Sequence, residues 1–296
     1  MAGIIDLSQL PAPEIVNTKS FESLLAEIRA DFLSRHPESA DALDLESEPV
    51  SKLLETAAYL SLIQRQKFKD GAKSLLLAYA EGAALDHIGV TYYHTERLEL
   101  QAAQPDADPP IPAVMESDED YKRRCQLAMD APSTAGSEYG YEYHALSAHE
   151  DVKDAKASSQ RAGIVGVSVL SRHGSGAASS ELVSIVKAAL SAERIRPLTD
   201  QVDVRSAEIL TYAVSAALQL RAGPDPEVVR SAAASAARAY VDERHALGET
   251  IVADKLKSVM YVQGVERVAL ASPTQDIVCD KTQAPYCTQL EVTTDG

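Results

Sequence analysis

Residues that could carry out chemistry are scattered along the chain, and their spacing argues against an active site. His144 and His149 are five residues apart, which is off the spacing of one helix face, and no His-Glu-x-x-His or Cys-x-x-Cys pattern is present. Asp200 and Asp203 are close enough in sequence to suggest a carboxylate pair. Because they lie in an extended or turning segment, however, their side chains are expected to diverge.

Phosphate-binding and nucleophile motifs are also missing from the sequence. Gly174-Ser175-Gly176 lacks the remaining glycine of a dinucleotide turn, and there is neither a Gly-Lys-Ser/Thr loop nor a Gly-x-Ser-x-Gly elbow. Asp86 is adjacent to His87, but neighbours in sequence point to different sides of a helix, so Asp86 is interpreted as a helix cap. We therefore expect no catalytic residues, no cofactor and no metal site, and a protein that is not an enzyme.

Composition narrows the class of partner. The chain of 296 residues has a formal net charge of −16, which argues against duplex DNA or an anionic membrane as a partner and favours solubility. The three cysteines, Cys125, Cys279 and Cys287, are too few and too scattered for a disulfide framework, so synthesis in a reducing cytosol is expected. Neither a signal peptide nor an apolar run of the roughly 20 residues that span a membrane is recognised.

The stretch from Ser179 to Val204 predicts a helix, a tight arm and a strand. Its apolar residues recur at helical spacing after a serine cap, and alternation returns beyond Pro197. The arm between them, Arg196-Pro197-Leu198-Thr199-Asp200, is unusually polar and rigid for a connector. Two compatible interpretations remain open: a local ion pair between Arg196 and Asp200, or a fixed edge held against a neighbouring subunit.

Before this stretch, the pattern is helical. One helix begins after Ser20, a second begins near Pro49 and continues to Gly82 with an allowed break near Asp70-Gly71, and an acidic connector separates them. These helices either close a bundle of their own or pack against another chain. The proline-rich run at 101–112 reads as a linker, and the basic run Lys122–Arg124 that follows reads as a solvated helix face.

The remaining pattern predicts two small tandem α/β units after the linker. The first has the order helix, strand, strand, helix, strand, and Val152–Ser159 resembles Val265–Ser272 in spacing. The predicted fold class is therefore α+β, an N-terminal helical bundle region followed by two small tandem α/β units. The predicted domains are a helical region at 1–100, a linker at 101–116, a middle α/β domain at 117–206 and a C-terminal α/β domain at 207–296.

Three stretches, RPLTDQVDV, AGSEYGYEYHAL upstream and AEGAALDHIG further upstream, resemble the baseplate J-like family. The family provides wedge proteins of contractile phage tails and of R-type bacteriocins, and the resemblance covers most of the chain from Phe21 onward. It implies a structural baseplate component that forms the wedge and links wedges into a ring around the central hub. The alternatives are a tail-associated hydrolase and a cytosolic ring-forming adaptor.

The resemblance also implies partners and a location. Expected partners are a second copy and a second wedge protein in a heterotrimeric wedge, a lysozyme-like sheath-connecting wedge protein, the central hub or spike, and neighbouring wedges. Assembly is expected in the host bacterial cytoplasm, and the mature protein in the tail baseplate. Residues of the N-terminal stripe are expected to line the bundle with these partners: Phe21, Leu24, Leu25, Ile28, Phe32, Leu53, Leu54 and Ala57.

Overall fold

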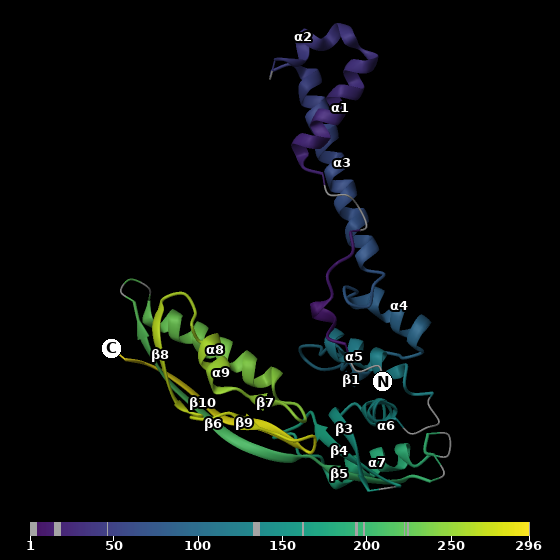
Figure 1. Ribbon diagram of the computed structural model, residues 1–296, viewed down its shortest axis with the longest axis vertical. Coiled ribbons are helices and arrows are strands. Elements are labelled where there is room, and N and C mark those ends of the chain that lie inside the picture. The colour runs from purple at the N-terminus through teal and green to yellow at the C-terminus, as the bar shows by residue number, and fades with distance from the viewer. Residues whose placement is uncertain are drawn as a thin grey trace. The chain divides into compact units, whose positions relative to one another are not determined.

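The computed structural model describes residues 5–14, 19–45, 47–132, 137–161, 163–192, 195–197, 199–221, 223 and 225–295. The chain divides into two compact units, and each is described by itself (Figure 1). The first unit is Met1–Glu96 with Ser117–Arg123, and the second is Arg97–Glu116 with Arg124–Gly296. Helices dominate the first unit and small sheets the second, which confirms the α+β class.

The first unit is built on a pair of helices that run side by side. Its elements in chain order are η1 (Leu7–Gln9), α1 (Phe21–Arg35), η2 (Pro37–Ser39), α2 (Ala40–Leu43), α3 (Pro49–Lys73) and α4 (Gly82–Tyr93). Ser20 caps α1 as predicted, since its hydroxyl accepts from the backbone N–H of Ser23 at 3.2 Å. The expected acidic connector contains the short helix α2.

Helix α3 departs from the predicted end of the second helix. It runs unbroken through Asp70 and Gly71, where the sequence allowed a break, and ends at Lys73. The next helix begins only at Gly82, whose φ of +49° gives the chain the turn expected there. The prediction of helix continuing from Pro49 to Gly82 was therefore wrong over the turns that separate α3 from α4.

Gly89 lies inside α4 and is buried, and it does not form the cap of the helix. The left-handed residue at the end of α4 is His94, with a φ of +51°. Gly89 is instead a contact position, because a Cβ there would overlap the ring and hydroxyl of Tyr121. As predicted, Leu85 and Ile88 of α4 are buried in this end of the unit.

The middle domain folds in the predicted order. Helix α5 (Asp118–Ala128) precedes α6 (Glu138–Leu146), β3 (Val152–Arg161), β4 (Ile164–Ser171), α7 (Ser180–Leu190) and β5 (Gln201–Ser206). Strand β4 is the centre of a three-stranded sheet, is mostly apolar and is buried from Gly166 onward. Helices α6 and α7 pack against the sheet, with Ala145, Val186 and Leu190 fully buried in the shared core.

The C-terminal domain repeats this plan in a different chain order. Its elements are β6 (Glu208–Leu220), α8 (Pro226–Glu243), β7 (Thr250–Ile251), α9 (Ala253–Val259), β8 (Val265–Ser272), β9 (Ile277–Val278) and β10 (Gln283–Asp295). The centre strand β6 pairs parallel with β10 and antiparallel with β8. In the middle domain, β4 pairs parallel with β5 and antiparallel with β3. The two segments compared in the sequence, β3 and β8, thus occupy the same antiparallel position in their sheets.

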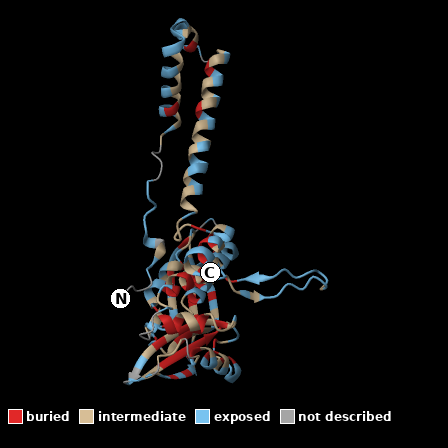
Figure 2. Ribbon diagram, turned by 90° about the vertical axis from the view of Figure 1, so that its right-hand side faces the viewer, coloured by how far each residue is buried: buried red, intermediate tan, exposed pale blue. Residues whose placement is uncertain are grey.

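The proline-rich segment read as a linker forms a two-stranded arm in the second unit. Strands β1 (Glu99–Gln101) and β2 (Val114–Met115) pair antiparallel, and a further bridge joins Gln104 to Ile111. Figure 2 shows this arm as an exposed ribbon that projects from its unit. We call residues Leu98–Met115 the β-arm.

Candidate protein interfaces

The face of α1 contacts α3 much as its apolar stripe predicts. Leu24 is buried, and Phe21, Leu25, Ile28 and Phe32 are half-buried. On α3 the residues buried most deeply are Ser51 and Ala58, so small side chains allow the two helices to approach closely. Leu54 and Ala57 are half-buried at the edge of this contact.

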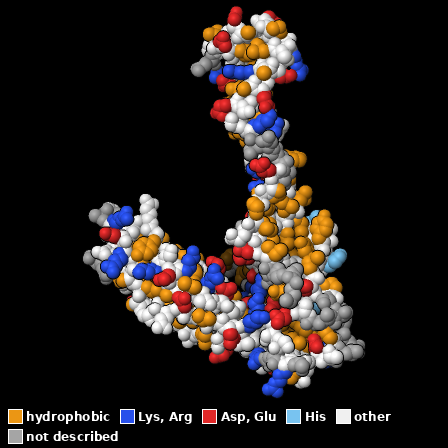
Figure 3. All heavy atoms as spheres, in the orientation of Figure 1, with side chains coloured by type: hydrophobic (Ala, Val, Ile, Leu, Met, Phe, Trp, Pro, Cys, Tyr) orange, Lys and Arg blue, Asp and Glu red, His pale blue; other side chains and the backbone are white. Residues whose placement is uncertain are grey.

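Leu53 differs from the other residues predicted to line the bundle. Its side chain is 67% exposed and belongs to a second stripe, which contains Leu60 and Phe68 on α3 and Leu75 in the turn just after the helix. Leu53, Leu60 and Phe68 are spaced by seven and eight positions, the spacing of a helix that packs along another helix, and Leu75 follows seven positions later. Phe68 and Leu75 are 63% and 75% exposed. We call this set the outer stripe, and Figure 3 shows apolar side chains lying open along the helical unit.

The end of the first unit is closed by hydrogen bonds from the start of α5. The Ser117 hydroxyl caps α5 by accepting from the N–H of Asp120 at 3.1 Å. The Tyr121 hydroxyl donates to the backbone oxygen of Thr95 at 2.6 Å, and Lys122 donates to the backbone oxygen of Ala78. The Gly82 N–H donates to an oxygen of Asp118 at 3.1 Å, which joins the start of α4 to the start of α5.

The base of the β-arm is held by a buried ion pair that sequence reasoning missed. Arg124, predicted to lie on a solvated face, is 4% exposed and contacts both carboxylate oxygens of Glu116, at 2.7 and 2.8 Å. Glu116 is 2% exposed and also accepts from the N–H of Leu98, while Arg97 donates to its backbone oxygen. The only signal in the sequence was an acid eight residues before an arginine, which is outside the spacings of three and four residues at which helix side chains pair.

Burial at this base also affects a thiol. Cys125 is buried next to the ion pair, and burial raises its pKa to about 11, against an ordinary value of 9.0. The Arg124 charge opposes this shift and the Glu116 charge adds to it. The neutral thiol is therefore an apolar core group, and it is a poor nucleophile.

The arm at 196–200 is braced, but not by the ion pair that the sequence suggested. Arg196 donates through Nη1 to the backbone oxygen of Asp200 at 2.7 Å, and the Asp200 carboxylate accepts from the Tyr141 hydroxyl at 2.9 Å. Burial, followed by the hydrogen bond to Asp200, raises the pKa of Tyr141 well above its ordinary value. Pro197 is half-buried, Thr199 is exposed, and Leu198 lies outside the described residues.

The candidates for chemistry do not converge. In the part of the chain that the structure describes, no group of three or more His, Cys, Asp or Glu side chains could hold a metal ion. His149 and His173 both approach Asp151, with His173 Nε2 at 2.7 Å from Oδ1, but this cluster is partly exposed and lies in a loop. The described residues also contain no helix long and apolar enough to cross a membrane.

Comparison with known proteins gives the family. Three family models match successive parts of the chain: the baseplate J-like N-terminal domain at 46–104, the baseplate J-like central domain at 133–206 and the baseplate J-like protein C-terminal domain at 212–293. Baseplate protein J of Escherichia phage P2 is 45% identical over 298 residues, which cover 99% of this chain and 98% of that protein. The chain belongs to the baseplate J-like family.

The three baseplate J-like matches correspond to the elements described above. The N-terminal match contains α3, α4 and β1, the central match contains α6 to β5, and the C-terminal match covers most of β6 to β10. The arm at 196–200 falls in the central match, and the outer stripe falls in the N-terminal match. The residues of α1 that were predicted to line the bundle lie before the N-terminal match.

A polar and apolar seam joins the central and C-terminal domains of this baseplate J-like chain. Asp154, which is buried, accepts from the N–H of Leu247 at 2.9 Å and from that of Ala155 at 2.8 Å. A small core beside it is shared by the two domains and consists of Leu170, Ala207, Leu247 and Ala284. An exposed ion pair of Lys281 with Glu138 also bridges the domains, at 2.8 Å. These contacts lie within the second of the two compact units.

Proposed function

We propose that this protein is a structural baseplate component of a phage tail and that it builds the wedge of that baseplate. Membership of the baseplate J-like family and the near-full-length likeness to the phage P2 protein support the baseplate role. The observation that supports the wedge role is the outer stripe, an apolar helix face that the described chain leaves uncovered. In the mature particle the protein would reside in the tail baseplate, after assembly in the host cytoplasm.

The helix pair is the part of the molecule least able to stand alone. Two helices bury only one face of each, and an apolar face left in water forgoes about 25 cal/mol per Å² of hydrophobic stabilisation. The first half of the outer stripe, Leu53 and Leu60 with Ala57 between them, lies beside the contact with α1. A third and fourth helix placed there would complete a bundle. We propose that they come from a second copy of this chain and from a second wedge protein.

The second unit suits a linking role. The seam at Asp154 and Leu247 joins its two domains by a buried hydrogen bond and a shared small core, through which a load on one domain would reach the other. Its sheets end in edge strands, and β10 is a 13-residue edge paired on one side with β6. We propose that this unit, with the arm at Arg196–Asp200, contacts neighbouring wedges to form a ring around the central hub or spike. A lysozyme-like wedge protein would connect the ring to the sheath.

A tail-associated hydrolase is the rival proposal from another class, and a cytosolic ring-forming adaptor is a third. A hydrolase would need an acid, base or metal cluster, and no observation on the described residues favours one. An adaptor outside a virion would not need the family's three domains in this order. We therefore propose a non-enzymatic role.

The test places charge on the outer stripe. Leu53→Glu with Leu60→Glu changes only exposed side chains, so the chain should fold, yet two carboxylates in an apolar bundle should prevent closure. Co-purification of the other wedge chains from cells making the particle should fall by roughly tenfold or more. The matched control is Tyr59→Glu, an exposed large side chain on another face of the same helix, which should leave co-purification unchanged. Equal recovery of partners with the stripe variant and the control would overturn the proposal.

A further inference from the structure

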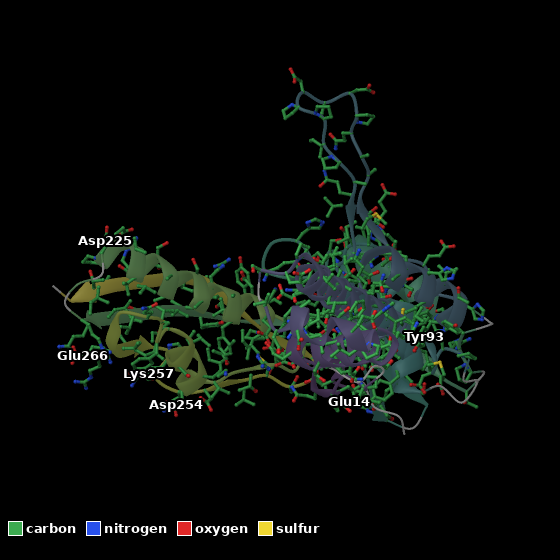
Figure 4. All side chains as sticks on the ribbon, turned by 90° about the horizontal axis from the view of Figure 1, so that it is seen from above. Glu14, Tyr93, Asp225, Asp254, Lys257 and Glu266 are labelled. Atoms are coloured by element: carbon green, nitrogen blue, oxygen red, sulfur yellow. The ribbon has the colours of Figure 1, made fainter. Side chains whose placement is uncertain are left out.

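The β-arm is an acidic, apolar ribbon whose charges are unpaired in the described structure. From Leu98 to Met115 it contains Glu99, Asp106 and Asp108 and no lysine or arginine. None of these three acids forms an ion pair with a described residue, and Ile111, Val114 and Met115 expose their side chains. In Figure 4 the two strands of the arm project with side chains on both sides open to solvent.

The arm is anchored more firmly than a linker requires. An isolated two-stranded ribbon is marginally stable in water. Here its base is fixed by the buried pair of Glu116 and Arg124, and Arg124 also donates to the Ser147 hydroxyl of the middle domain. Burying two charges is costly unless the geometry is good, as it is in this bidentate pair. A ribbon whose base is anchored in this way suits a docking element.

A complementary surface lies on the second half of α3. Between Thr56 and Ala80 the only acid is Asp70, whereas four residues are basic: Arg65, Lys67, Lys69 and Lys73. None of the four forms an ion pair with a described residue, which is unusual in a chain of net charge −16. The same segment exposes Phe68 and Leu75, and Figure 3 shows blue side chains among the orange ones on this unit.

The contact with α1 does not reach this surface. Helix α1 has 15 residues and α3 has 25, and the short connection through α2 joins the end of α1 to the start of α3. At a rise of 1.5 Å per residue, about 15 Å of α3 extends beyond α1. We call residues Arg65–Leu75 the basic segment; it is separate from the Leu53–Leu60 half of the outer stripe that the bundle proposal uses.

We propose that the β-arm of one copy of this protein docks on the basic segment of a second copy. Asp106 and Asp108 would face Lys67 and Lys69, while Ile111 and Met115 would cover Phe68 and Leu75. The inference rests on the proposed function, in which two copies share a wedge. Each copy carries one arm and one segment, so the contact is either reciprocal in a two-fold pair or head-to-tail.

The experiment is a charge exchange in the full chain. One variant reverses the arm, Asp106→Lys with Asp108→Lys, and a second reverses the segment, Lys67→Glu with Lys69→Glu. Self-association is measured by sedimentation over a range of concentrations at low salt. Each variant alone should associate roughly tenfold or more weakly than the wild-type chain, because like charges then face each other. An equimolar mixture of the two should recover association, because each arm then meets a segment of opposite charge.

Controls separate this contact from the bundle. Asp254→Lys with Glu266→Lys reverses two exposed acids of the C-terminal domain, labelled in Figure 4, and should leave self-association unchanged. All variants keep the outer-stripe residues Leu53 and Leu60, so they should still co-purify the second wedge protein. If only the variant Leu53→Glu with Leu60→Glu loses the second wedge protein, the bundle proposal is supported. The mixture of the arm and segment variants then tests the arm contact independently.

Three outcomes would overturn the inference. The first is a wild-type chain that stays monomeric at every concentration. The second is a mixture that associates no better than either variant alone. The third is a chain that carries both reversals and associates no better than either variant alone, because its arm and its segment again have opposite charges and should pair between copies.

Discussion

Replacing Arg124 with methionine is the perturbation that most sharply tests the structure of the arm base. The change keeps an unbranched side chain but leaves the Glu116 carboxylate buried with the Leu98 N–H as its remaining close donor. Removing one partner of a buried pair costs about 3–5 kcal/mol, because the other charge stays in a low-dielectric site. Opening of the β-arm and the adjoining part of α5 should therefore become easier by about that amount.

Hydrogen exchange followed by mass spectrometry measures this opening locally. Amides of 97–101 and 114–128 should exchange roughly 150- to 5,000-fold faster, since each 1.36 kcal/mol is a factor of ten. The matched control is Arg238→Met, which breaks an exposed ion pair with Asp242 at 3.1 Å. It should change the free energy of local opening by less than about 1 kcal/mol. Adding Glu116→Gln to Arg124→Met should restore much of the loss. A local change no larger than that of the control would refute the buried pair as the anchor of the arm.

Three further predictions concern buried groups. Gly89→Ala should destabilise the first unit by about 1–3 kcal/mol despite the better helix propensity of alanine, because the methyl overlaps Tyr121; thermal unfolding checks this, and Tyr121→Phe should recover part of the loss. Asp154→Ala should cost about 2–5 kcal/mol by leaving two buried N–H groups unpaired, seen as faster exchange at 245–249, whereas Asp203→Ala on an exposed position should not. Burial raises the pKa of both Cys125 and Cys279 to about 11 from 9.0, so at pH 8 their alkylation should be about 100-fold slower than in the unfolded chain. Equal alkylation of the folded and unfolded chains would contradict the raised pKa values. Because these values favour the folded chain with protonated thiols, the free energy of unfolding should fall as the pH rises from about 9 to about 11.

Much of the fold follows from local signals. Ser20 and Ser179 cap helices as predicted, because a cap needs only a short side chain and a nearby N–H. The order of helices and strands in the middle domain also follows from periodicity, since a buried strand such as β4 is nearly continuously apolar.

The features that sequence reasoning missed depend on partners distant in the chain. Gly89 has a role only because Tyr121 lies against it, and Arg124 is buried only because Glu116 folds back beside it. The prolines of 101–112 indicated extended chain, but the pairing of β1 with β2 depends on the anchor at their base. On α3, periodicity predicted an apolar face without deciding which apolar residues α1 covers, so Leu53 was grouped with residues that lie against α1.

The most direct test of the central claim, that other chains complete this helix pair, is a comparison of hydrogen exchange in α1 and the first half of α3 between the isolated chain and the assembled baseplate. The account predicts that amides of 21–35 and 49–60 exchange rapidly in the isolated chain and become strongly protected in the particle, while the core strand β4 is protected in both. Equal protection of these helices in the two states would contradict it.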